Sequence, residues 1–270
     1  MTRQNGYLPP LWNAHRVTAA TCVALMVPLA VAIFERGAGI VTPLVFALGL
    51  AVLWPLVFAR MRRRPMGWDG IVTALIFVLL LPGPVPLWQQ GLALSFGLVM
   101  GDLIFGGRGR GFLNPAVVGL AFLLFSFPGT ASETPGPSVA IAAGVGGALL
   151  LALGLLSWRV VVGFGFGIAG LMALLPVPED WVALHSASLV LGLVFLIGDP
   201  VAAACTNGGR LLYGGLAGAL VVVLGQTGGG TGTLKTLVFA ALLASIFAPL
   251  IDQIVITANI RWRARRQGNG

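Results

Sequence analysis

The sequence LIGDPV, from Leu196 to Val201, ends an apolar segment at a proline and places an aspartate beside it. An earlier stretch, LLLPGP from Leu79 to Pro84, also ends an apolar segment at a proline. Proline removes a backbone donor and breaks a helix. The segments that end here, 71–82 and 185–198, are shorter than the roughly 20 residues of a bilayer crossing. We interpret both as broken helices, whose loose backbone is tolerated in a membrane only where it lines a cavity or a bound group.

The composition is typical of a protein that lies in a membrane. Of the 270 residues, 57% are hydrophobic and only 9% are charged, whereas a soluble domain carries about 25% charged residues. The mean hydropathy is +0.97 and the isoelectric point is about 11.2. So basic a soluble protein would indicate nucleic acid, but here the arginines are better explained as markers of cytoplasmic helix ends. We therefore expect a lipid bilayer around the chain and no nucleic-acid partner.

A weak internal repeat relates the two halves of the chain. Aligning Pro82 with Pro200 also matches Phe77 with Phe195, and the broken segment is the third of five in each half. Five crossings per half is an odd number, so the halves would be inverted, as in transporter-like folds that bind a ligand between them. The alternative is that apolar helices align by composition alone. The ten apolar segments are 17–34, 38–59, 71–82, 87–105, 113–128, 138–157, 160–177, 185–198, 211–226 and 235–257.

We therefore expect an all-α integral membrane protein of about ten transmembrane segments, built as two inverted five-helix repeats with broken third and eighth helices. The whole chain, 1–270, would form a single membrane domain. With the N-terminus inside, fourteen arginines lie on the inner side and only Arg36 and Lys235 lie outside, which predicts that both termini are cytoplasmic. The parts of the domain would be a cytoplasmic N-terminal tail (1–16), the first repeat (17–128), the second repeat (138–257) and a basic cytoplasmic tail (258–270).

The first polar island is GGRGRGFLNPAVVG, residues 106–119, between two apolar segments. Its glycines do not have the spacing of a dinucleotide-binding loop and no strand precedes them. Asn114 and Pro115 suit the start of a helix. Arg108, Arg110 and Asn114 are candidate ligand-binding residues. The alternative is a turn of inside charges followed by a capped helix.

The second polar island is GDPVAAACTNGGRLLYGG, residues 198–215. Asp199 lies at or near membrane depth, where a charge is costly and is a functional candidate, and Thr206 and Asn207 add hydrogen-bonding groups. The alternative is that Asp199 caps nearby backbone amides. Asp102 and Asp252 either pair with arginines at the interface or serve a proton or cation relay. Two cysteines and two histidines are too few and too widely spaced for a metal site, so none is expected.

At these islands the chain resembles a family of membrane proteins from two respiratory complexes. These are the RnfD component of the Rnf ferredoxin:NAD oxidoreductase and the NqrB component of the sodium-pumping NADH:quinone reductase. The family pattern G-G-x-G-R-N-x-F-N-P-A is similar to residues 106–116, with Gly111 in place of the asparagine. The pattern D-P-V-x-A-x-x-T-N-x-G-R-x-x-Y-G is matched from Asp199 to Gly214, and LLASIFAPLID, residues 242–252, is similar to the family's last helix.

The resemblance implies a flavin and a location in the bacterial inner membrane. Family members commonly carry FMN esterified to a threonine in a D-x-x-[ST]-x-A-T motif by a separate flavin transferase, and some also hold riboflavin non-covalently. Thr134 is the threonine in the corresponding place. The sequence departs from the motif there, because Pro128, Ala131 and Glu133 stand where Asp, Ser or Thr, and Ala are expected. Non-covalent flavin is the alternative to covalent FMN at Thr134.

Three functions remain open on the sequence alone. The resemblance implies a flavin-containing electron-transfer protein, coupled to Na⁺ or H⁺ translocation and working with the other subunits of a membrane redox complex. The chain has no NADH, iron–sulfur or haem motif, so it would be a non-autonomous part of an oxidoreductase with no catalytic residue of its own. A transporter or channel for a cation or small solute could use the same fold without redox chemistry. A purely structural role in assembly is the third function.

Overall fold

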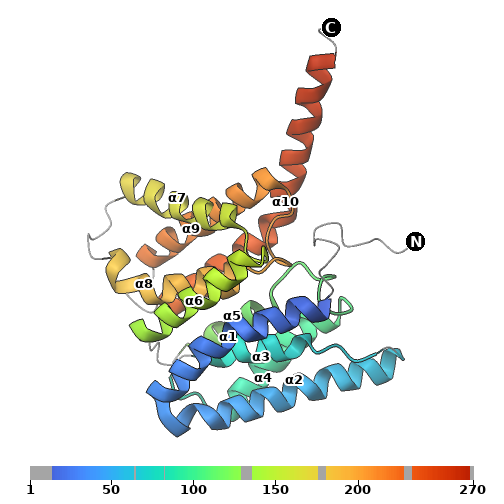
Figure 1. Cartoon of the computed structure of the whole chain (residues 1–270), viewed down its shortest axis with the longest axis vertical. Coiled ribbons are helices and arrows are strands. Elements are labelled where there is room, and N and C mark those ends of the chain that lie inside the picture. Colours follow the sequence, from blue (N-terminus) through green and yellow to red (C-terminus); the bar gives the residue numbers. More distant parts are fainter. Residues whose placement is uncertain are drawn as a thin grey trace.

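The computed structural model describes residues 14–63, 65–81, 83–128, 136–175, 181–227 and 233–267, and within them every regular element is helical (Figure 1). This confirms the all-α prediction. Three short stretches depart from α-helical geometry: a 3₁₀ turn, η1, and two π-helical turns, η2 and η3. The elements are α1 (Ala14–Arg36), η1 (Gly37–Ile40), α2 (Val41–Arg62), α3 (Asp69–Leu79), α4 (Leu87–Leu98), η2 (Val99–Leu103), α5 (Pro115–Ser126), α6 (Pro137–Ala152), α7 (Trp158–Leu174), α8 (Trp181–Gly192), η3 (Leu193–Ile197), α9 (Asn207–Thr227) and α10 (Thr233–Gln267).

Four helix pairs that pack together in the first half of the chain recur in the second half. The contact of α1 with α3 recurs as α6 with α8, and that of α2 with α4 recurs as α7 with α9. Likewise α3 with α5 recurs as α8 with α10, and α4 with α5 recurs as α9 with α10. Two further contacts, α1 with α6 and α5 with α10, join the halves, and α1 and α6 run in opposite directions in Figure 1. The contact of α2 with α3 has no counterpart of similar extent between the described parts of α7 and α8, and the inverted repeat stays a prediction from the sequence.

The third helix is short and largely buried. α3 has 11 residues, nine of them buried, and an α-helix of that length spans only about 16 Å. A helix that is apolar on all sides belongs in the interior of a bundle. It ends at Leu79, and Pro82, to which we assigned the break, lies outside the described residues. α8 also ends early, because its last turn widens into η3 and the chain leaves the helix at Gly198.

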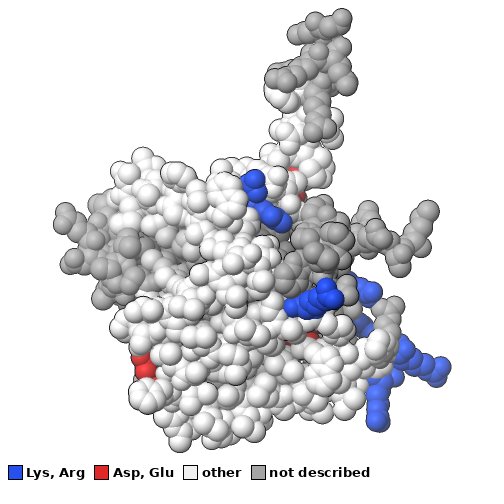
Figure 2. Space-filling model, in the orientation of Figure 1, with Lys and Arg blue, Asp and Glu red and all other residues white. Residues whose placement is uncertain are grey.

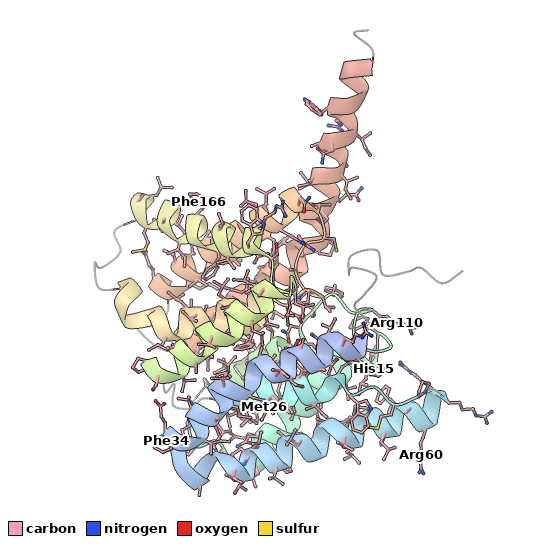
Figure 3. The ribbon with its side chains drawn as sticks, in the orientation of Figure 1. His15, Met26, Phe34, Arg60, Arg110 and Phe166 are labelled. Carbon is pink, nitrogen blue, oxygen red and sulfur yellow. The ribbon has the colours of Figure 1, made fainter. Side chains whose placement is uncertain are left out.

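The outer surface carries large apolar side chains, as expected for a membrane protein. Met26 on α1 and Phe166 on α7 are 58% and 71% exposed, and Phe166 lies at the outer edge of the bundle in Figure 3. By length and composition, three helical stretches of the described residues could cross a membrane: His15–Arg62, Asn207–Gln226 and Leu234–Trp262. The other apolar helices are shorter. The number of crossings therefore stays a prediction from the sequence.

Glycines let α7 and α9 approach each other closely. A Cβ atom on Gly163 would lie 2.3 Å from the carbonyl oxygen of Leu211, and one on Gly167 would lie 2.2 Å from that of Gly215. Neither distance is compatible with any side chain. Small residues four apart allow this kind of backbone contact between helices in membranes.

Candidate functional site

A small polar cavity lies where α3, η3 and the two polar islands of the sequence meet. Its volume is about 40 Å³, which is room for one or two water molecules. We call it the buried cavity. Apolar walls come from α3, the turn between α6 and α7, and η3. The polar side chains that line it are those of Thr21, Asp69, Thr73, Asp102, Arg108, Asn114 and Asp199.

An ion pair brings the two islands together at this cavity. The Nη2 atom of Arg108 lies 3.6 Å from Oδ1 of Asp199, and the two side chains are only 14% and 11% exposed. The same Oδ1 accepts a hydrogen bond of 3.2 Å from the backbone amide of Val201. Asp199 therefore caps a nearby amide, as one alternative predicted, and also faces a cation. Among the described residues, the buried Nε of Arg108 has no hydrogen-bond partner, so one donor of this guanidinium is left for a ligand or water.

Backbone conformation explains why the first island is so rich in glycine. Gly106, Gly107 and Gly109 have φ angles of +104°, +98° and +85°, which residues with a Cβ atom rarely adopt. These turns place Arg108 against the cavity and leave Arg110 exposed. The two arginines, which the sequence pattern groups together, therefore have different surroundings.

Asn114 is buried and uses both ends of its amide group. Its Oδ1 accepts a 2.9 Å hydrogen bond from the amide of Ala116, which confirms the predicted cap at the start of α5. Its Nδ2 donates a 3.1 Å bond to the carbonyl oxygen of Phe195 in η3. The side chain thus ties the first half of the chain to the second. With both groups occupied, Asn114 is better suited to positioning the cavity wall than to holding a ligand.

Thr206 and Asn207 lie at the start of α9 and line neither of the cavities described here. The Thr206 hydroxyl accepts a 3.0 Å bond from the amide of Gly209 and donates a 2.6 Å bond to Asp252. Asp252, on α10, also accepts bonds of 2.6 and 2.9 Å from the backbone amides of Cys205 and Thr206. These amides are the partners of Asp252, for which the sequence suggested an arginine or a relay. This group of bonds fixes the second island onto α10.

A second, more open pocket of about 280 Å³ adjoins the buried cavity. We call it the open pocket. It lies toward the arginine-rich end of the bundle, the end that carries Arg60 and Arg110 in Figure 3 and most of the visible basic atoms in Figure 2. Its lining includes His15, Arg62 and Arg110, and it shares Asp69, Asp102 and Arg108 with the buried cavity. The two spaces therefore adjoin at these three residues.

Some of the residues at these cavities were not identified from the sequence. Asp69 begins α3 and accepts a hydrogen bond from the Thr18 hydroxyl. Its signal in the sequence is an acidic residue at the start of an apolar segment. Thr21 and Thr73 lie on apolar helices, and only the tertiary structure shows that both line the buried cavity. Thr134 lies outside the described residues, and within those residues no group of three or more His, Cys, Asp or Glu side chains could hold a metal ion.

Comparison with known proteins gives the family. The chain is 32% identical over 290 residues to the NqrB protein of the Na⁺-translocating NADH-quinone reductase of Ectopseudomonas mendocina (strain ymp), covering 86% of this chain and 71% of the relative. The NqrB proteins of Pseudomonas aeruginosa (strain LESB58) and Yersinia pestis are 32% and 30% identical over 80% and 79% of this chain, and 66% and 65% of those relatives are covered. The chain thus spans about two thirds of the length of these relatives. The family model of NQR2, RnfD and RnfE matches residues 7–138 and 129–261, and the chain belongs to that family.

Proposed function

We propose that the chain is a membrane subunit of an electron-transport complex of the Nqr or Rnf kind and carries a flavin in the buried cavity. The observation that carries this proposal is the ion pair of Arg108 and Asp199, which joins the two family-like islands around an enclosed polar space. The names of the relatives support the same function. Because the chain has no motif for NADH or an iron–sulfur cluster, it would need other subunits as electron donor and acceptor.

The chemistry of the cavity fits the edge of a flavin ring. That edge carries carbonyl oxygens and ring nitrogens, which need donors and acceptors within reach. Arg108 offers an unpaired Nε donor, and Asp199 offers a carboxylate. Apolar residues such as Ile76 and Phe195 supply walls for the ring faces. A bound flavin would supply the conversion between two-electron and one-electron transfer.

The size of the cavity adds a requirement. A volume of about 40 Å³ does not hold three fused rings, so binding requires the apolar walls to move apart. Leu155 and Leu156, in the turn between α6 and α7, and Phe195 in η3 form those walls. Phe195 is held through its carbonyl oxygen by Asn114 and is only 2% exposed, so its ring would have to move together with its neighbours in the core. Flavin at the buried cavity would be non-covalent, and FMN on Thr134, attached by a flavin transferase, would be a second and separate group.

The proposal places the protein in the bacterial inner membrane as ten crossings in two inverted repeats. The recurring helix contacts support the repeat, and the arginine-rich end supports an orientation with that end and both termini in the cytoplasm. Coupling of electron transfer to Na⁺ or H⁺ movement would follow from membership of the same family.

The test is flavin content with and without the ion pair. The protein is purified after co-expression with a flavin transferase, its intact mass is measured, and acid-extracted flavin is quantified. We expect extractable flavin in the wild type and much less of it in Arg108→Ala. A buried charge-assisted bond contributes about 1.5–3 kcal/mol, so its loss should weaken flavin binding at least roughly tenfold. The control is Arg60→Ala, at an exposed position, which should keep the flavin. A wild-type protein with neither covalent flavin in its intact mass nor flavin in the acid extract contradicts the proposal.

A transporter or channel is the second candidate. The observation that favours it is that the open pocket and the buried cavity share three polar residues. A cation or small solute could pass along such polar groups without a cofactor. Flux of cations into liposomes that contain the flavin-free protein would distinguish it, because an electron-transfer subunit has no such flux by itself.

A further inference from the structure

Asp102 is a buried carboxylate without a partner among the described residues. The residue is 8% exposed, and it lines both the buried cavity and the open pocket. Within the described part of the chain, its side chain takes part in no hydrogen bond and no ion pair. Burying a carboxyl group that has neither a hydrogen bond nor an ion pair is costly, so the position of this side chain calls for a reason other than stability.

The local backbone brings Asp102 to this place. The last turn of α4 widens into η2, Val99–Leu103, and π turns of this kind occur frequently at functional sites. Gly101 lies so close to α5 that a Cβ atom there would be 2.8 Å from Cα of Pro115. Arg62 of α2 holds the other side of the turn through bonds of 2.6 and 3.1 Å to the carbonyl oxygens of Leu103 and Ile104. Asp102 is thus fixed between two helices at the boundary of the two spaces.

Charged side chains line the spaces on both sides of Asp102. Asp69 of α3 and Arg108 of the first island line the same two spaces, and Asp199 lies on the buried side only. Arg62, His15 and Arg110 line the open pocket. Arg108 is engaged with Asp199 at 3.6 Å, so this arginine does not form an ion pair with Asp102.

We propose that Asp102 transfers protons between the open pocket and the buried cavity. The O–H bond of its carboxylic acid would break, and the proton would move into the buried cavity to the reduced flavin that the proposed function places there. The carboxylate then takes a proton from water in the open pocket, and no electron passes through the side chain. The inference rests on the proposed electron-transfer function, because an electron that arrives in a small buried cavity creates a charge that a proton neutralises.

The surroundings favour a proton over a metal cation as the transferred species. A hard cation such as Ca²⁺ takes about six to eight oxygen ligands, and no group of three or more His, Cys, Asp or Glu side chains in the described residues is arranged to hold a metal. A single carboxyl group, by contrast, is sufficient to carry one proton.

The first measurement is proton uptake by the flavin-loaded protein. Wild type, Asp102→Asn and Asp102→Glu are brought to equal flavin content and reduced photochemically in weak buffer with a pH dye. We expect Asp102→Asn to keep its flavin and to take up protons at least about tenfold more slowly, as for loss of a general acid, and Asp102→Glu to restore the rate. Glu35→Gln, at the opposite end of α1, is the control and should match the wild type. An unchanged rate in Asp102→Asn would overturn the proposal.

The second measurement needs no flavin, so it separates this inference from the proposed function. Infrared spectra of the flavin-free protein over a pH series should show a carboxylic acid band that is missing in Asp102→Asn. The band should shift within the dead time of transfer into D₂O, because the open pocket admits water. A band that does not exchange over hours overturns the proposal. Loss of the band on adding NaCl but not KCl at constant pH would also overturn it, since it would show a sodium ligand.

Discussion

Asn114 links the two halves of the chain with one buried amide group. Its oxygen caps α5 and its nitrogen reaches η3, 81 residues further along the chain. Both contacts lie next to Arg108 and Asp199 in the wall of the buried cavity, so the distance across that cavity depends on this side chain. A residue of this kind acts by holding the binding groups in place, and its contribution can be measured as stability.

Replacing Asn114 separates its two roles. Asn114→Ala loses the cap and leaves the Phe195 carbonyl without its donor, so we expect unfolding to require about 1–3 kcal/mol less free energy. Asn114→Ser keeps an oxygen for the cap but lacks the amide that donates to Phe195, and it should fall between Ala and the wild type. Unfolding in detergent, followed by circular dichroism, measures both. Equal stability of all three proteins would show that these bonds contribute nothing.

At the scale of elements, the helices of the second half are held by close backbone contact. α7 and α9 meet through glycines, where even a methyl group lacks space. The first half packs the equivalent pair, α2 and α4, with larger residues, such as the Trp54 indole that donates a 2.8 Å bond to the Ser95 hydroxyl. The pairs therefore correspond in topology but are stabilised by different contacts.

Two glycines on α7 provide a matched comparison. A Cβ on Gly167 would lie 2.2 Å from the Gly215 carbonyl oxygen, whereas one on Gly165 has no atom within 4 Å. We expect Gly167→Ala to destabilise the protein by about 1–3 kcal/mol, because the helices must separate. Gly165→Ala should be neutral or slightly stabilising, since alanine favours helix. Thermal unfolding in the same detergent measures the two variants, and similar losses in both would contradict the close contact.

At the scale of the whole molecule, basic residues gather at one end of the bundle, and the C-terminal part of α10 projects beyond the other helices (Figures 1 and 2). The open pocket is at this end. Phe34 and Arg60 lie at opposite ends in Figure 3. If the arginine-rich end is cytoplasmic, water and protons reach Asp102 from the cytoplasm.

The orientation can be tested with single cysteines. In a chain with Cys22→Ala and Cys205→Ala, we expect a membrane-impermeant thiol reagent to label Arg60→Cys only in inside-out vesicles. Phe34→Cys, at a position where the side chain is 91% exposed, should react only in right-side-out vesicles. The cysteine-free parent is the control for background labelling. Labelling of both from the same side would contradict a membrane crossing by α2, and the reverse pattern would contradict the orientation.

The sequence identified individual candidate residues of the site better than it identified the groups with which those residues interact. Arg108 and Asp199 are each predicted from local patterns, but their ion pair joins residues from the two halves of the chain, which no local pattern shows. For Asp252 the sequence suggested an arginine, because charges commonly pair, and the structure instead gives it backbone amides at the start of α9. Asp69 was missed because one acidic residue at the start of a helix is common.

By itself, the sequence determined the all-helical class, the membrane character, the short third helix and the cap at Asn114. These follow from composition, hydrophobic segment length and local capping, which act over a few neighbouring residues. Only the tertiary structure decided that the two islands enclose one cavity, that Arg108 faces it while Arg110 does not, and that Asp102 borders both spaces with no partner among the described residues. The physical reason is that burial and charge pairing depend on which distant helices pack together, and the glycine contacts and the widened turns set that packing.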